Sequence, residues 1–425
     1  FFSLFGSAFL YLLGAYLLGY SAIGQPFILL LPFSLSGCVK AQPSGNNNDK
    51  NYSNSSHLLT MVSGANNVCV SDSGIYHTEL GDGGNYSIIY YIDSDTLKEI
   101  PLCSSAGCKH EDDTCTAYIT DSNPYIFASR TDDKIFIIQK TFLDGGYTTS
   151  IYSMTENGSD RKEIYKLNNG ESFSLSGVIA QYDDLIYIIK DVFSDGEMTE
   201  VLVRIDYKNH TATEVCRFPE NSKIIGADDD NLYICTEYFV GANRTTITKF
   251  NVKNNEEQRI TIFNTGNRSY FYSEGKVYRI ESTEEFAVEE VNLNDGSCNV
   301  VYTNPNYKSD WSFSVLNTVD NYIIMSYVGT DTKIKHLAYD AENQNIYDLT
   351  LKITGDDQRE AFVTILACTD DYYYVSMKST LKEGLFMGND GNYYTGNYTV
   401  LEKRLIAKND YFNNIENYKV INTET

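Results

Sequence analysis

A short pattern recurs seven times along this chain: an acidic residue, a turn residue and a run of aromatic and aliphatic residues. Its copies are marked by Tyr76, Phe136, Tyr187, Tyr233, Tyr278, Ile323 and Tyr374. Successive markers lie 60, 51, 46, 45, 45 and 51 residues apart, and 51 residues follow the last. A period of about 45–50 residues fits four short strands with their turns, which make one propeller blade. The sequence therefore predicts an all-β fold, a seven-bladed β-propeller of four-stranded antiparallel blades.

Each copy also contains runs in which apolar and polar residues alternate, such as residues 200–207 and 245–252. Asn, Asp and Gly separate these runs, and alternation broken by turn residues is typical of antiparallel hairpins. Amphipathic helical patterns are almost absent from the sequence after residue 60. We expect the following residues to occupy equivalent strands near the middle of their sheets: Ile135, Ile186, Leu232 and Val277.

The first 39 residues hold no charged side chain and are apolar or small throughout. They include the run LSGC at residues 35–38, which resembles the lipobox of bacterial lipoproteins. We expect a lipoprotein signal peptide over residues 1–37 and a lipid on Cys38, with a transmembrane anchor as the alternative. The polar residues 38–58 predict a flexible tether, and the propeller then spans residues 59–425. This arrangement predicts a lipid-anchored protein on the extracytoplasmic face of the cell membrane.

The chain is acidic, with a net charge of −24 and an isoelectric point of about 4.5. Its field repels nucleic-acid phosphates and anionic lipid headgroups. We therefore expect no nucleic-acid partner, and a monomeric domain that stands away from the membrane surface. Solubility alone is an alternative reason for the acidity.

Three of the nine cysteines and one of the five histidines fall within residues 102–115. The four candidate metal ligands are Cys103, Cys108, His110 and Cys115. Three thiolates and one imidazole make a tetrahedral donor set for a structural zinc ion, which is the only cofactor we expect. Two other interpretations stay open. An extracytoplasmic location and an even number of cysteines besides Cys38 favour a local disulfide, and the thiols could also be free and structural.

The blades have a "D-x-[I/L]-Y … L-x-R-I-D" character that resembles the YWTD propellers of lipoprotein receptors and the TolB-type propeller. Residues 103–118 also read C-x4-C-x-H-x4-C-x-A-Y, and the lipobox precedes them. With these features, the chain from residue 35 to 425 resembles a family of uncharacterised Gram-positive surface lipoproteins. The resemblance implies a seven-bladed propeller outside the membrane and no particular activity.

Motifs of catalysis are missing from the sequence. It holds no G-x-S-x-G elbow, no H-E-x-x-H, no P-loop and no G-x-G-x-x-G after a strand. His77, His210 and His336 stand alone within strand or turn patterns, which is typical of structural histidines.

The seventh copy contains an insertion that bears glycine and aromatic residues, at residues 379–397. Insertions at a fixed place in a propeller form loops on one face, which is often the binding face. The candidate contact residues are Phe386, Met387, Tyr393 and Tyr394. A long hairpin that packs on its own sheet is the alternative.

Two functions remain after these exclusions. The first is a membrane-anchored module whose propeller binds or scaffolds a surface protein, peptide or glycan. The second is a propeller enzyme, a lyase or hydrolase, that uses the central channel. A catalytic metal in the channel would need ligands from several blades, whereas the cysteine motif lies within one short segment, so the sequence favours binding.

Overall fold

The computed structural model describes residues 60–62 and, apart from short gaps, residues 67–423. The expected signal peptide, the lipidation site Cys38 and the tether lie outside the described residues. Within the described part of the chain, no helix is long and apolar enough to cross a membrane.

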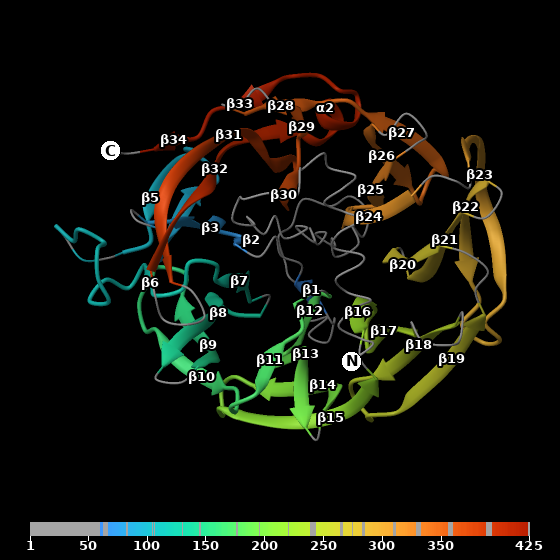
Figure 1. Ribbon diagram of the computed structural model, residues 1–425, viewed down its shortest axis with the longest axis horizontal. Helices are drawn as coiled ribbons and strands as arrows, with labels where there is room; N and C mark the ends of the chain where they lie inside the picture. The colour runs from blue at the N-terminus through green and yellow to red at the C-terminus, as the bar shows by residue number, and fades with distance from the viewer. Residues whose placement is uncertain are drawn as a thin grey trace, which may run out of the picture.

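Seven four-stranded antiparallel sheets stand in a ring (Figure 1), so the chain is an all-β, seven-bladed propeller as the repeat predicts. Blade 1 contains β2 (Val68–Val70), β3 (Gly74–Leu80), β4 (Ser87–Asp93) and β5 (Lys98–Pro101). Blade 2 contains β7 (Tyr125–Ala128), β8 (Lys134–Leu143), β9 (Gly146–Thr155) and β10 (Lys162–Lys166). Blade 3 contains β12 (Ile179–Tyr182), β13 (Leu185–Ser194), β14 (Glu197–Asp206) and β15 (Thr211–Pro219).

The remaining four blades repeat this order from the inner to the outer strand. Blade 4 contains β16 (Ser222–Ala227), β17 (Asn231–Tyr238), β18 (Arg244–Asn251) and β19 (Glu257–Phe263). Blade 5 contains β20 (Asn267–Ser273), β21 (Lys276–Ser282), β22 (Glu285–Val291) and β23 (Cys298–Lys308). Blade 6 contains β24 (Ser312–Val319), β25 (Tyr322–Val328), β26 (Ile334–Asp340) and β27 (Asn345–Leu349). Blade 7 contains β30 (Ile365–Cys368), β31 (Tyr372–Met387), β32 (Tyr393–Ala407) and β33 (Tyr418–Lys419).

Shorter elements extend the blades. In blade 3, β1 (Thr60–Val62) pairs with the inner strand β12, and β11 (Glu171–Phe173) pairs with β13. A two-stranded sheet of β28 (Lys352–Thr354) and β29 (Glu360–Phe362) precedes blade 7, and α2 (Lys408–Phe412) joins β32 to β33. The C-terminal β34 (Asn422–Thr423) pairs in parallel with β5, which ties the end of the described chain to blade 1.

Acidic residues at or next to the acidic position of the repeat shape the turn between the first two strands of a blade. In blade 4, Asp228 Oδ1 accepts a hydrogen bond from the N–H of Asn231 at 3.0 Å, and Oδ2 accepts one from the Tyr233 hydroxyl at 2.5 Å. Asp183 and Asp320 hold the equivalent turns with φ of +49°, a left-handed conformation that Asp tolerates better than most residues.

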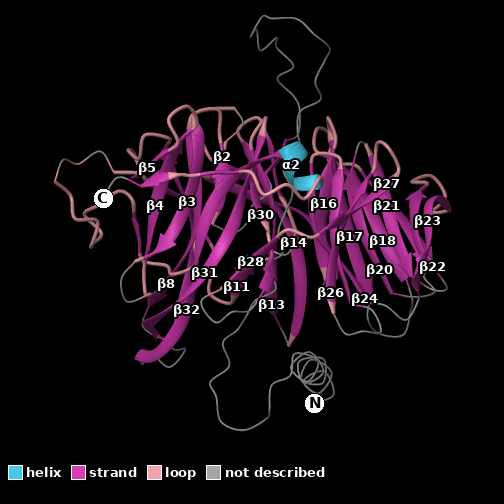
Figure 2. Cartoon of the chain, turned by 90° about the horizontal axis from the view of Figure 1, so that it is seen from above, coloured by secondary structure: helices cyan, strands magenta, loops and turns pink. Residues whose placement is uncertain are grey.

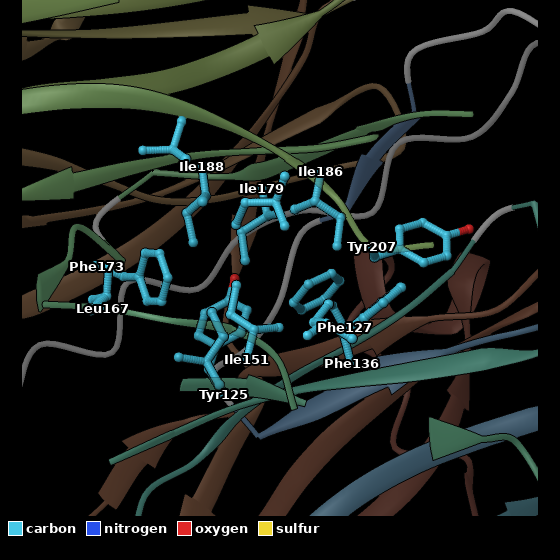
Figure 3. Packing of buried hydrophobic residues seen from close by; sticks show 14 of the residues in the cluster. Tyr125, Phe127, Phe136, Ile151, Leu167, Phe173, Ile179, Ile186, Ile188 and Tyr207 are labelled. Carbon is cyan, nitrogen blue, oxygen red and sulfur yellow. The ribbon is translucent and has the colours of Figure 1, made fainter. Parts of the chain in front are cut away.

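Each pair of neighbouring blades shares a cluster of buried apolar side chains, which we call a seam. In the seam between blades 2 and 3 (Figure 3), the rings of Phe127 and Phe136 stack with centroids 4.9 Å apart. The predicted equivalent residues are Ile135, Ile186, Leu232 and Val277, which are all 0% exposed in the second strands of blades 2 to 5. The prediction of equivalent strands is therefore confirmed.

The two faces of the ring carry different connections. The hairpins between second and third strands end on one face, which we call the hairpin face, and the other two turns of each blade lie on the opposite face. In Figure 2, the hairpin of β31 and β32 reaches lowest, while α2 lies at the upper side. The fold thus separates the turns that carry the acidic motif from the hairpin tips.

Candidate metal centre

The outer strand of blade 1 is interrupted by a loop that carries the cysteine motif. Both β5 and the short β6 (Tyr118–Ile119) pair with β4. Between them, the carbonyl of Ile89 accepts the N–H of Leu102 at 2.9 Å, and the N–H of Ile89 donates to the carbonyl of Ala117 at 2.9 Å. Residues 103–116 therefore leave the sheet and return to the same edge. We call this segment the cysteine loop. It interrupts the outer strand of blade 1, whose two parts are β5 and β6.

The cysteine loop brings all four predicted ligands together. The Sγ atoms of Cys103, Cys108 and Cys115 and a ring nitrogen of His110 lie within 4.8 Å of one another. His110 Nδ1 lies 3.2 Å from Cys115 Sγ. A tetrahedral zinc ion with bonds of about 2.3 Å to sulfur holds two sulfur atoms about 3.8 Å apart. The cluster fits such an ion after only small side-chain movements.

Tight turns inside the loop produce this convergence. The N–H of Cys108 donates to the carbonyl of Ser105 at 3.2 Å, and the N–H of Cys115 donates to the carbonyl of Asp112 at 3.1 Å. Gly107 and His110 have φ of +72° and +59°, so both adopt the left-handed conformation. Glycine adopts this conformation readily, whereas histidine does so only where the surrounding structure holds it.

Blades 1 and 2 hold the base of the loop on both sides. Cys115 is 2% exposed and belongs to the seam between these blades, against which Cys103 and Cys108 also pack. Gly158 of blade 2 approaches so closely that a Cβ atom there would lie 2.4 Å from the carbonyl oxygen of Leu102. Arg161 Nη1 donates to the carbonyl of Tyr118 at 2.6 Å. A metal in this loop would therefore be anchored to two blades.

The three thiols differ in their acidity. Burial raises the pKa of Cys115 to about 12, and the neighbouring thiols of Cys103 and Cys108 add to the rise. The pKa of Cys103 is lowered, because hydrogen bonds from Ser105 and from the other two thiols outweigh the opposing effect of its own burial. Because zinc binds thiolates, metal binding would release these protons.

The other five described cysteines are dispersed through the blades. Cys69 and Cys368 lie on inner strands, Cys235 is buried in a second strand, and Cys216 and Cys298 lie on outer strands. Among the described residues, the cysteine loop is the one place where at least three histidine, cysteine or acidic side chains converge as metal ligands.

The predicted contact residues of the seventh copy lie on a long hairpin. Its insertion continues β31 and β32 past the blade, with Phe386 opposite Tyr394 and Met387 opposite Tyr393. Tyr394 is 53% exposed. The side chains of the other three residues lie outside the described ones, so their contact role stays a prediction.

Sequence reasoning missed a wider set of exposed apolar side chains on the hairpin face. Those of blades 2 to 4 are Tyr147, Phe193, Met198 and Phe263, and those of blades 6 and 7 are Ile334, Leu381 and Tyr394. In the sequence, most of them are large apolar residues within a few positions of the turn between the second and third strands. Phe263 instead stands at the end of a fourth strand. Alternation alone cannot assign such a residue to solvent or core.

Glu200 is the one described carboxyl group whose pKa is raised to a neutral value. Burial raises its pKa to about 7. Its Oε1 accepts the N–H of Asn221 at 3.1 Å, and Oε2 accepts the N–H of Ser222. Both partners belong to the connection into blade 4, so this carboxyl group fixes a connection between blades.

No protein-family model and no curated protein matches the chain. Solved structures with similar folds include puromycin hydrolase, with 8% identity over 84% of this chain and 53% of that one and a TM-score of 0.49. The chain therefore spans about half the length of that protein. The propeller domain of the Trilobed protease from Pyrococcus furiosus is 10% identical over 81% and 97%, with a TM-score of 0.46. Oligogalacturonate lyase from Vibrio parahaemolyticus is 11% identical over 76% and 88%, with a TM-score of 0.47. At these identities, the likeness concerns the propeller fold alone.

Proposed function

We propose that the protein is a membrane-anchored extracytoplasmic lipoprotein whose propeller binds or scaffolds a surface ligand, with one structural zinc ion in the cysteine loop. The position of the Cys3His cluster carries this proposal. The cluster lies on the outer strand of blade 1, whereas a propeller enzyme would place its metal in the central channel.

The ligand set supports a structural role for the metal. Four protein ligands fill a tetrahedral zinc shell and leave no position for a reacting water or substrate. Cys115 is buried in the seam of blades 1 and 2, so the bound ion would stabilise the return of the chain from β5 to β6. The metal then contributes to the fold, and binding takes place on other surfaces of the ring.

Metal analysis tests the site. Protein purified without an affinity tag should contain one zinc per chain, and His110→Ala should lower this content. His210→Ala is the matched control, because His210 is exposed and lies in a turn of blade 3. Chelation should speed amide hydrogen exchange in residues 103–119 and leave blades 4 to 6 unchanged. Absence of zinc together with an oxidised Cys103 or Cys108 would contradict the proposal.

The lipid anchor needs a separate test. The run LSGC at residues 35–38 supports lipidation of Cys38, and the polar residues after it support a tether. In a Gram-positive host, the wild-type protein should partition into detergent and Cys38→Ala should not. Equal partitioning of both proteins would indicate a transmembrane anchor instead.

A further inference from the structure

We propose that the hairpin face of blades 2, 3 and 4 is a docking surface for an apolar segment of another protein, of neutral or positive charge. This inference rests on the proposed binding function and names its surface and partner class. We call Tyr147, Phe193, Met198 and Phe263 the docking residues.

The distribution of exposed apolar side chains points to this face. Within the described residues, eleven large hydrophobic side chains are exposed. Six of them lie beside hairpin tips or at a strand end on the hairpin face, and a seventh, Leu381, lies along the long hairpin of β31 and β32. The four others are Ile100, Val300, Ile415 and Val420, which lie on outer strands or after α2. Scattered exposed apolar residues are ordinary, but a concentration on one face marks an interaction site.

Blade 3 shows how the fold presents these side chains. Phe193 on β13 and Met198 on β14 are direct cross-strand partners one step from the hairpin tip. Their exposed fractions are 65% and 42%. The ladder of β13 and β14 holds both backbones, so the two side chains stand on a fixed support. Little backbone order then has to be gained when a partner binds.

Blade 4 adds the most exposed apolar residue of the face. Phe263 is 80% exposed at the end of β19, directly opposite Arg244 on β18. The Arg244 guanidinium carbon lies 4.5 Å from the centre of the Tyr238 ring on β17. Blade 4 thus places the exposed Phe263 ring next to Arg244, whose guanidinium group stacks on the Tyr238 ring. Aromatic residues, methionine and arginine are the residue types enriched where proteins bind proteins.

Charge decides among the occupants of such a surface. A second copy of this chain would bring another net charge of −24, and an anionic bilayer would also repel the protein. A glycan binds through many hydroxyl groups, for which the docking residues offer one polar partner, the Tyr147 hydroxyl. A neutral or basic protein that inserts apolar side chains avoids both penalties.

Selection from a random linear peptide library displayed on phage tests the proposal with the full chain as target. We expect enriched peptides that carry aromatic or aliphatic residues and no net negative charge. Phe193→Ser combined with Met198→Ser should weaken a selected peptide at least tenfold. Ile100→Ser combined with Val300→Ser is the matched control, and it should leave the affinity unchanged.

Several results would overturn the docking surface. One is a failure to enrich any peptide, and another is equal loss of affinity in both double variants. Dimerisation of the full chain, or binding to phosphatidylglycerol vesicles, would also overturn it if Phe193→Ser abolished either. Peptides that bind the full chain but do not depend on Phe193 would leave the binding function standing and remove only this surface.

Discussion

Two seams of the same ring are built in different ways. Among the residues that the structure describes, the seam between blades 2 and 3 contains fifteen buried apolar residues, including the stacked Phe127 and Phe136. The seam between blades 7 and 1, where the first and last blades meet, contains seven described ones. The seam at which the ring closes therefore has the smaller apolar cluster, and polar interactions contribute to it as well.

A partly buried network of ionisable groups occupies the seam between blades 7 and 1. His77 on β3 is 1% exposed, and its Nε2 lies 2.8 Å from Glu99 Oε1 on β5. Its Nδ1 lies 3.1 Å from the ammonium nitrogen of Lys403 on β32, which also contacts Glu79. The same Nδ1 lies 3.2 Å from Glu79 Oε1, so the imidazole meets a carboxylate through each of its ring nitrogens. The rings of Tyr90 and Tyr374 flank this imidazole.

The difference shows how a ring can be closed between two distant ends of the chain. Apolar seams form wherever two blades meet. A network of two carboxylates, a lysine and a histidine is satisfied in one arrangement only, because each unpaired buried charge is costly. Glu99 also lies opposite Thr423 of β34, so the network adjoins the strand that ties down the end of the described chain.

The largest expected effect concerns the apolar seam. Phe136→Ala removes a fully buried ring between blades 2 and 3 and should lower the free energy of unfolding by about 4 kcal/mol. Guanidinium denaturation followed by fluorescence measures this change. Phe193→Ala is the control, because this exposed ring should change stability by less than about 0.5 kcal/mol. Equal losses in the two variants would refute the assignment of Phe136 to the core.

The next effect concerns the charged seam. Lys403→Met removes the cation that faces Glu79 and His77, and it should lower the free energy of unfolding by about 2 kcal/mol. This loss is smaller than for a fully buried pair because Glu79 is 30% exposed.

The control for the charged seam is an exposed pair on blade 5. Lys276 lies 2.8 Å from Glu290, with exposed fractions of 50% and 34%. Lys276→Met should change stability by at most about 1 kcal/mol. If both lysine variants behave alike, the network contributes no more than a surface ion pair.

Acid should weaken the charged seam selectively. Burial opposes ionisation of Glu79, but Lys403 and His77 outweigh it and lower the pKa of Glu79 to about 2, from an ordinary value of 4.5. A lowered folded-state pKa contributes stability above pH 4.5, and this contribution is lost as the pH falls toward 2. The stability difference between wild type and Lys403→Met should therefore shrink from pH 7 to about pH 3. The Phe136→Ala difference should stay constant, and a constant Lys403→Met difference would count against the network.

The sequence predicts the ring well because its signal is local. Each acidic turn and the strand after it lie within a few residues, so seven copies suffice to predict seven blades and their second strands. The set of metal ligands is likewise contained in residues 103–115, and the structure brings all four together.

Features that depend on distant pairing could not be derived from the sequence. The interruption of the outer strand depends on both edges of the cysteine loop binding Ile89. The closing network joins His77 to Lys403 across 326 residues. His77 could be recognised as a structural histidine, but its partners follow only from ring closure. Likewise, alternation along β13 does not show that Phe193 is exposed.

The smallest expected effect comes from one hydroxyl group in the charged seam. Tyr374 is fully buried, and its hydroxyl has no hydrogen-bond partner within the described structure. Burial, with Glu79 and Glu99 nearby, raises its pKa well above the ordinary value, so the hydroxyl stays neutral. Tyr374→Phe should therefore leave stability unchanged or raise it by up to about 1 kcal/mol, because a buried polar group without a partner is removed.

Tyr233→Phe provides the contrast. Its hydroxyl donates to Asp228 at 2.5 Å, and its removal should lower stability by about 1–1.5 kcal/mol. A loss of that size for Tyr374→Phe would mean that the hydroxyl is bound within the seam, and that the closing network extends to a fifth side chain.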